Sequence, residues 1–405
     1  MTEPGAGTRR AYGLVVAGAF GYTCLTFVWF SLPAYLSTVS AELGLTGTQA
    51  GVLVGAVPLT YVPLALASGV VVDRAGPGRS LAAGALVFGL AQIARSAAPG
   101  FPSLLAATLL VGVGATAVTF GLPKLVSVLF PPERTGTPSS IYLIGSSVGS
   151  AGVFGVGRPV LGPMLGGWRP LFFWSGVVAV GYAAVWFAVA RRAGVDDRSA
   201  EDEGSFSLGS VRRDLRLILA HRELQLVVVV GTMYLLVNHG VQGWLPTVLE
   251  ARGLSAGLAG RIASGFVAAF ALGVAAVPAV ADRYAARRTA VVACGLVAFA
   301  GGVGLTVGGV GPLLYAGVVA TGVGVGGLSP LVRAIPPDLE GVGAELTGTA
   351  VGFVFAVGEV GGFLGPVLVG SLRGLTGSYA PGLALLAGAG LVVAGAGGAL
   401  RRLDG

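Results

Sequence analysis

The stretch that decides the fold is Gly69-Val-Val-Val-Asp73-Arg74-Ala-Gly76-Pro-Gly78-Arg79, a short charged turn between two long apolar runs. A weaker copy lies half a chain later and reads Pro278-Ala-Val-Ala-Asp282-Arg283-Tyr-Ala-Ala-Arg287-Arg288. Both copies keep the aspartate–arginine pair and end in a basic cluster. A repeat over half the chain indicates two similar halves in tandem.

The composition indicates a membrane protein. Of the 405 residues, 54% are hydrophobic and only 11% are charged, and a bilayer span needs about 20 apolar residues. The chain also holds 70 glycines and 22 prolines, which membrane helices tolerate better than soluble ones. Twelve spans are predicted: 12–36, 48–72, 80–98, 102–129, 138–164, 169–190, 224–249, 257–281, 289–308, 311–335, 346–372 and 379–400.

The arginines predict the orientation of these spans. With the N-terminus inside, most basic residues fall on the cytoplasmic side, beginning with Arg9 and Arg10. This bias accounts for the net charge of +7 without a nucleic-acid partner. We expect a multi-pass protein of the plasma or inner membrane, with cytoplasmic N- and C-termini and an uncleaved first span.

The predicted fold class is an all-α polytopic membrane protein with 12 transmembrane helices in two pseudo-symmetric six-helix bundles. The first bundle is predicted over 1–190 and the second over 224–405. The polar segment 191–223 joins them as a cytoplasmic linker, with a possible amphipathic helix from Val211. The fifth and eleventh spans share a glycine pattern at one constant offset. It pairs Gly145, Gly149, Gly155, Gly162-Pro163 and Gly167 with Gly348, Gly352, Gly358, Gly365-Pro366 and Gly370.

The Gly69–Arg79 turn resembles the loop 2–3 signature of the major facilitator superfamily. The chain departs from that signature at Gly78, which stands where a basic residue is usual, and at Pro278 and Ala285, which replace glycines. Leu122–Arg134 and Trp244-Leu-Pro-Thr are similar to the cyanate and nitroimidazole transporter-like branch. The nitrate/nitrite porters are more distant, since the second span has no arginine. The resemblance implies a secondary transporter with its solute near the midplane, between the two halves.

For the turn itself, the resemblance implies a cytoplasmic gate that latches in the outward-open state. A glycine allows close helix approach, and an aspartate beside a helix N-terminus meets the positive end of the dipole. The alternative is a solvated turn whose arginines only follow the orientation bias. The predicted gate residues are Gly69, Asp73, Arg74, Arg79, Asp282 and Arg283.

Charged residues inside the spans are functional candidates, because burying a charge in a bilayer is costly. Glu359 is predicted to exchange a proton, and the alternative is a packing acid paired with an arginine. Arg158 and Lys124 are predicted to bind an anionic solute, and the alternative is that they snorkel to the interface. Arg333 and Arg261 are expected to be interfacial charges.

Polar and aromatic side chains in the first and seventh spans complete the predicted solute site. A run of three polar residues on a helix with an aromatic beside it suits a binding cavity. The alternatives are interfacial aromatics and a histidine that hydrogen-bonds within the packing. The predicted solute-binding residues of these spans are Asn238, His239, Gln242, Tyr22, Thr26 and Trp29.

No enzyme constellation is apparent: the sequence has no Walker-type loop, no metal-ligand spacing and no nucleophile with a base. Cys24 and Cys294 are isolated in apolar runs. We therefore expect no cofactor and no metal, with transport driven by an ion gradient of protons. The hypothesis is a monomeric proton-linked secondary active transporter that moves a small anionic solute by alternating access. The alternative is proton-coupled efflux of lipophilic or drug-like cations.

Overall fold

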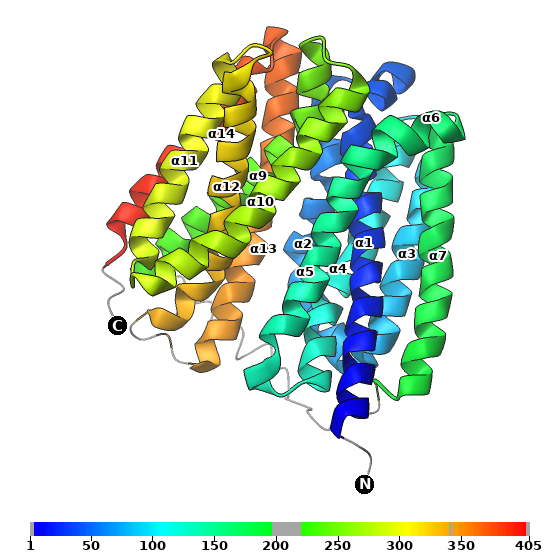
Figure 1. The fold of residues 1–405 in the computed structure, drawn as a ribbon. Helices are drawn as coiled ribbons and strands as arrows, with labels where there is room; N and C mark the ends of the chain where they lie inside the picture. Colours follow the sequence, from blue (N-terminus) through cyan, green and yellow to red (C-terminus); the bar gives the residue numbers. More distant parts are fainter. Residues whose placement is uncertain (1–3, 197–219, 340–341, 343, 402–405) are drawn as a thin grey trace. The chain divides into compact units, whose positions relative to one another are not determined.

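The computed structural model describes residues 4–196, 220–339, 342 and 344–401 (Figure 1). These residues form helices and turns and contain no strand, because a helix satisfies all its backbone polar groups internally, as a bilayer requires. Eleven of the described helices are long and apolar enough to cross a membrane. The third predicted span, α3 (Pro77–Ser96), has similar length but carries Gln92 and Arg95. Most of the predicted linker, with the helix expected from Val211, lies outside the described residues.

Packing divides the chain into two compact units, which are described separately. Unit 1 comprises Met1–Leu32 and Pro63–Ser205, and unit 2 comprises Pro33–Val62 and Phe206–Gly405. Both changes of unit fall at a proline within a long helix, in α1 (Pro4–Leu43) and α2 (Gly47–Ala75). Residues 33–62 thus group with the later helices, whereas the sequence repeat divides the chain between 190 and 224.

Unit 1 is built around α3, which packs against α4 and α7. A Cβ added at Gly84 would lie 2.7 Å from the carbonyl oxygen of Gly114 on α4. One added at Gly176 on α7 would lie 2.7 Å from the carbonyl oxygen of Gly89. The remaining elements of the unit follow in chain order: α4 (Phe101–Leu129), the 3-10 turn η1 (Pro132–Arg134), α5 (Gly136–Gly152), the π-helical η2 (Val153–Leu161), α6 (Gly162–Leu165) and α7 (Trp168–Ala193).

Unit 2 repeats this arrangement around α11, which packs against α12 and α14. A Cβ at Gly317 on α12 would lie 2.8 Å from the carbonyl oxygen of Gly301, and one at Gly390 on α14 would lie 2.7 Å from that of Gly295. The predicted repeat is therefore visible as a matching pair of glycine contacts in each unit. The elements are α9 (Arg222–Ala251), α10 (Ala256–Arg283), α11 (Arg287–Val307), α12 (Pro312–Ala334), the 3-10 turn η3 (Pro336–Asp338), α13 (Ala344–Thr376) and α14 (Ala380–Ala399).

The part of α2 that belongs to unit 2 lies directly against α13. Glycines at every fourth position of α2 face this helix: a Cβ at Gly51 would lie 2.6 Å from the carbonyl oxygen of Pro366, and one at Gly55 would lie 2.7 Å from that of Phe363. The Thr48 and Ser371 hydroxyls, 3.1 Å apart, share a hydrogen bond at the end of the same contact. This seam places the next turn of α2 beside the middle of α13.

The two copies of the charged turn share one backbone feature. Gly76 has φ +84° and separates α2 from α3, and its counterpart Ala285 follows α10 with φ +44°. Ala285 N–H donates to the Asp282 carbonyl and Ala286 N–H to that of Ala281, the hydrogen-bond pattern of a Schellman cap. Positive φ strains a residue with a Cβ. Ala285 therefore adopts a backbone conformation that favours glycine, the residue at the equivalent position of the first copy.

We expect Ala285→Gly to stabilise the protein and Gly76→Ala to destabilise it. Removing the Cβ at Ala285 relieves about 1–2 kcal/mol of strain. The greater freedom of glycine in the unfolded chain offsets part of this gain, so the net stabilisation is about 0.5–1 kcal/mol. Thermal unfolding of the purified protein in detergent measures both changes. Gly69→Ala is the control, because a Cβ there meets no heavy atom within 4 Å among the described residues. A lower midpoint for Ala285→Gly would contradict the assignment of strain.

Candidate functional site

Three polar side chains of α9 are buried within unit 2. Asn238, His239 and Gln242 are each less than a tenth exposed. Gln242 Nε2 donates a 2.7 Å hydrogen bond to Asn238 Oδ1 one turn away, as expected of residues four apart on a helix. The predicted polar stripe is therefore present, and its two amides bind each other.

Glu359 lies buried on α13 and faces the remaining polar residue of that stripe. Its carboxyl Oε2 lies 3.6 Å from His239 Nε2, which is longer than a hydrogen bond. The same oxygen has no hydrogen-bond partner among the described residues. A buried carboxyl group without full hydrogen bonding is costly as an anion, which makes this pair a functional candidate.

Arg333 lies at the end of α12 and is exposed. Its Nη1 donates to the Ser329 carbonyl at 2.8 Å and to the Ser329 hydroxyl at 2.9 Å. The guanidinium carbon lies 4.2 Å from the centroid of the Phe355 ring, a cation–π contact. Phe355 stands one helical turn before Glu359 on α13, so Arg333 is anchored close to the acidic residue.

The predicted solute residues of unit 1 lie on α1, α4 and η2. Thr26 is buried and its hydroxyl donates to the Tyr22 carbonyl at 3.0 Å and to the Ser146 carbonyl of α5 at 2.8 Å. Trp29 is half-buried and stacks on Phe30. Arg158 is half-buried in the π-helical segment. The Thr26 hydroxyl thus serves the contact between α1 and α5, which the sequence did not predict.

Sequence reasoning missed a buried polar network in unit 1. Arg95 is 1% exposed and its Nη1 donates to the Val28 carbonyl of α1 at 3.1 Å and to Gln92 Oε1 at 3.0 Å. Gln92 Nε2 in turn donates to the hydroxyls of Ser31 and Ser175, at 3.0 and 3.2 Å. Gln92 and Arg95 stand one turn apart inside an apolar run, and this spacing was the available signal.

In the first copy of the turn, the acid that meets a helix N-terminus is Asp196 rather than Asp73. Gly78 N–H, in the first turn of α3, donates to Asp196 Oδ1 at 2.7 Å, and Arg79 Nε lies 3.7 Å from Asp196 Oδ2. Asp73 belongs to the last turns of α2 and pairs with Lys124 Nζ at 3.0 Å. Within unit 1 the α3 N-terminus is thus met by Asp196, and the gate role of Asp73 stays a prediction.

In the second copy, Asp282 pairs with Arg287, whose Nε lies 2.9 Å from Asp282 Oδ1. Arg287 also pairs with Asp338 of η3 and so joins α10, α11 and the end of α12. Arg283 lies over the ring of Tyr284 at 5.9 Å. Each copy therefore places its aspartate in an ion pair, although the cation comes from a different helix in each unit.

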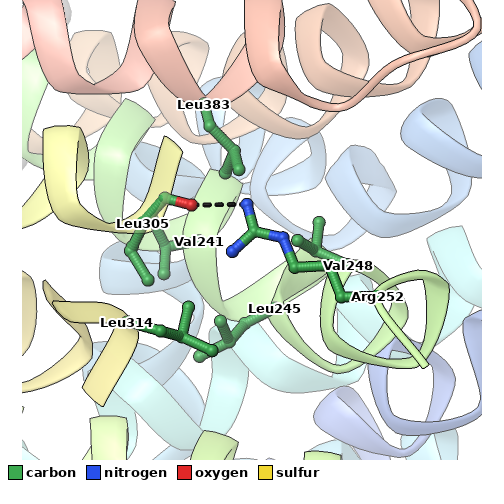
Figure 2. Close-up of a pocket in the computed structure, with 7 residues that line it drawn as sticks. All are labelled: Val241, Leu245, Val248, Arg252, Leu305, Leu314 and Leu383. Carbon is green, nitrogen blue, oxygen red and sulfur yellow. Dashed lines mark hydrogen bonds between the residues drawn. The ribbon is translucent and has the colours of Figure 1, made fainter. Parts of the chain in front are cut away.

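A small apolar pocket of unit 2 lies at the far end of α9 (Figure 2). Arg252 closes it and donates to the carbonyls of Leu305 and Gly308 at the end of α11. Burial lowers the pKa of Arg252 from its usual range. The two hydrogen bonds hold the guanidinium against the end of α11, beside the apolar lining of the pocket. Its other lining residues are Val241, Leu245, Val248, Leu314 and Leu383.

The fold and the buried polar groups define a polytopic helical membrane protein of the transporter class. The sequence pattern of the Major Facilitator Superfamily matches residues 18–366. The chain belongs to this family, as the turn at Gly69–Arg79 indicated. It is therefore a multi-pass membrane transporter of a small-molecule solute and not an enzyme.

Several relatives cover most of the chain. The 3-(3-hydroxy-phenyl)propionate transporter of Escherichia coli (strain K12) is 28% identical over 88% of this chain and 85% of its own. The hexuronate transporter of Bacillus subtilis (strain 168) is 24% identical over 93% of this chain and 90% of its own. Among solved structures, that of a D-xylose-proton symporter has the same fold, with a TM-score of 0.76, 12% identity and 98% of each chain covered.

A charge swap between Lys124 and Asp73 should show whether Lys124 acts in a gate pair or binds the solute. If the two residues act as a gate pair, Lys124→Asp and Asp73→Lys alone each slow transport roughly fivefold, the factor that about 1 kcal/mol represents. The double variant then recovers most of the rate. Uptake into proteoliposomes of a solute that thermally stabilises the protein measures this. Loss of rate in both single variants without recovery in the double variant would instead place Lys124 on the solute.

Proposed function

We propose that this transporter is proton-linked and moves a small anionic solute by alternating access. The observation that carries the proposal is the buried Glu359 carboxyl, with Oε2 unsatisfied beside His239. A carboxyl group in such surroundings exchanges a proton when its exposure to water changes, which is what coupling to a proton gradient requires. The name of the hydroxyphenylpropionate relative describes a carboxylic acid, which supports an anionic solute.

In this proposal positive charge on the solute path comes from Arg158, whose guanidinium offers a carboxylate two parallel donors. Lys124 contributes only when its pair with Asp73 opens. Polar and aromatic groups orient the solute: Asn238, His239, Gln242, Tyr22, Thr26 and Trp29. The two charged turns latch the cytoplasmic side through Gly69, Asp73, Arg74, Arg79, Asp282 and Arg283.

The proposal extends to the oligomeric state, the membrane location and the source of free energy. The chain works as a monomer in the plasma or inner membrane, with both termini in the cytoplasm. It needs no cofactor or metal, because the proton gradient supplies the free energy. Export of lipophilic cations is the competing function, with Glu359 as the contact for the cation, and the experiment below separates the two.

We expect carboxylates to raise the thermal unfolding midpoint of the detergent-purified protein, since a ligand that binds the folded state stabilises it by mass action. The probes are 3-(3-hydroxyphenyl)propionate, glucuronate, nitrate and tetraphenylphosphonium. At 100 times its dissociation constant a ligand contributes about 2.7 kcal/mol. Arg158→Ala should abolish the shift for anions, and Arg261→Ala, an exposed arginine of α10, is the matched control.

Two results decide between the competing functions. Stabilisation by tetraphenylphosphonium alone, lost in Glu359→Gln, identifies an exporter of cations and contradicts the anion proposal. Proton-driven accumulation of the stabilising solute tests the coupling. Accumulation by Glu359→Gln equal to that of the wild type would refute Glu359 as the coupling group.

A further inference from the structure

Gly362 creates the space that the Glu359 carboxyl occupies. A Cβ added at Gly362 would lie 2.6 Å from Glu359 Oε2, 2.9 Å from His239 Cδ2 and 3.2 Å from Pro58 Cβ. All three neighbours belong to unit 2. The carboxyl end of Glu359 and the edge of the imidazole ring therefore share one small site against the backbone of α13, beside Pro58 of α2.

Most polar groups around this site are engaged with other partners. Asn238 and Gln242 bind each other at 2.7 Å, which leaves His239 as the member of the α9 stripe that faces Glu359. Pro58, contributed by α2, has no charge. The charge of Arg333 on α12 also acts on Glu359, but its guanidinium stays on Ser329 and Phe355. Among these groups, His239 is the one that can exchange a proton with the carboxyl.

We propose that His239 is a positioning residue of the proton site, sharing a single proton with Glu359, and is not a contact for the solute. This inference rests on the proposed proton coupling and names the partner of its acidic group. When the site is empty of protons, Glu359 is a carboxylate and His239 is neutral. When it is loaded, one proton lies between Glu359 Oε2 and His239 Nε2.

The transfer within the pair balances without any other reactant. As the O–H bond of the carboxylic acid breaks, the N–H bond of the imidazolium forms, and the reverse step restores the neutral pair. A closer approach of about 0.5 Å brings the two atoms, now 3.6 Å apart, within hydrogen-bond distance. The pair as a whole then differs by one proton between its loaded and empty states.

The experiment is an infrared titration of the protonated carboxyl band in the purified, solute-free protein. We expect this band to disappear in Glu359→Gln. In His239→Asn its midpoint should move to more acidic pH by about one unit, because the imidazole no longer accepts the shared proton and stabilises the protonated pair. Gly362→Ala should move it in the same direction, since the added Cβ displaces the carboxyl from the ring. Both residues of the pair remain present in that variant.

Gly352→Ala is the matched control on the same helix. A Cβ at Gly352 meets no heavy atom within 4 Å among the described residues, so the midpoint should equal that of the wild type. His239→Gln is measured beside His239→Asn, and size-exclusion profiles verify that each variant is folded. An unchanged midpoint in both histidine variants overturns the inference while leaving Glu359 as the coupling group. A band that survives Glu359→Gln overturns the proton coupling itself.

A transport assay separates a role of His239 in proton coupling from a role in solute binding. Exchange of a labelled solute at equal concentrations on both sides needs no net proton movement, whereas accumulation does. We expect His239→Asn to retain exchange within twofold of the wild type and to show a shifted pH profile of accumulation. Loss of exchange together with an unchanged midpoint would place His239 on the solute and overturn the inference.

Discussion

Close helix approach through glycine is the constraint on which the rest of this structure depends. In a bilayer, packing apolar side chains against each other gives no hydrophobic free energy relative to contact with lipid. Helices therefore associate where their backbones can touch. Here α3 and α11 each touch two neighbours in this way, through Gly84 and Gly89 in one unit and Gly295 and Gly301 in the other. These contacts fix the helices that carry the buried polar groups, and any misplacement of them would separate those groups.

The sequence predicted the helical membrane fold, the family and the repeat, because each depends on composition or on short local patterns. It did not predict which glycines make contact. The constant offset pairs Gly149 with Gly352. Gly149 lies against Thr23 and Thr26 of α1, whereas a Cβ at Gly352 would meet no described residue within 4 Å. The rotation of each helix about its axis decides this, and a repeat in the sequence does not specify that rotation.

The same limit applies to the candidate site. The sequence identified Glu359 and the α9 stripe, since polar residues in an apolar run are conspicuous. It could not identify their partners, which come from helices far apart in the chain. At the N-terminus of α3 the acid is Asp196, which the sequence did not predict, because the chain after α7 returns to α3. Arg95 was not a predicted site residue; its hydrogen-bond acceptors are neutral, and only the packed structure brings the Val28 carbonyl within reach.

The two units differ in how a buried ionisable group is paired. In unit 1 neutral acceptors on two helices hold the Arg95 guanidinium in place, and its role is to fix α1 against α3. In unit 2 the Glu359–His239 pair joins two groups that can each bind and release a proton, and their nearest polar atoms lie 3.6 Å apart. A group held in place suits a scaffold, whereas a variable charge suits a step that must be reversed in every transport cycle. The physical case for placing proton exchange in unit 2 therefore rests on the weakness of its pairing as much as on the presence of an acid.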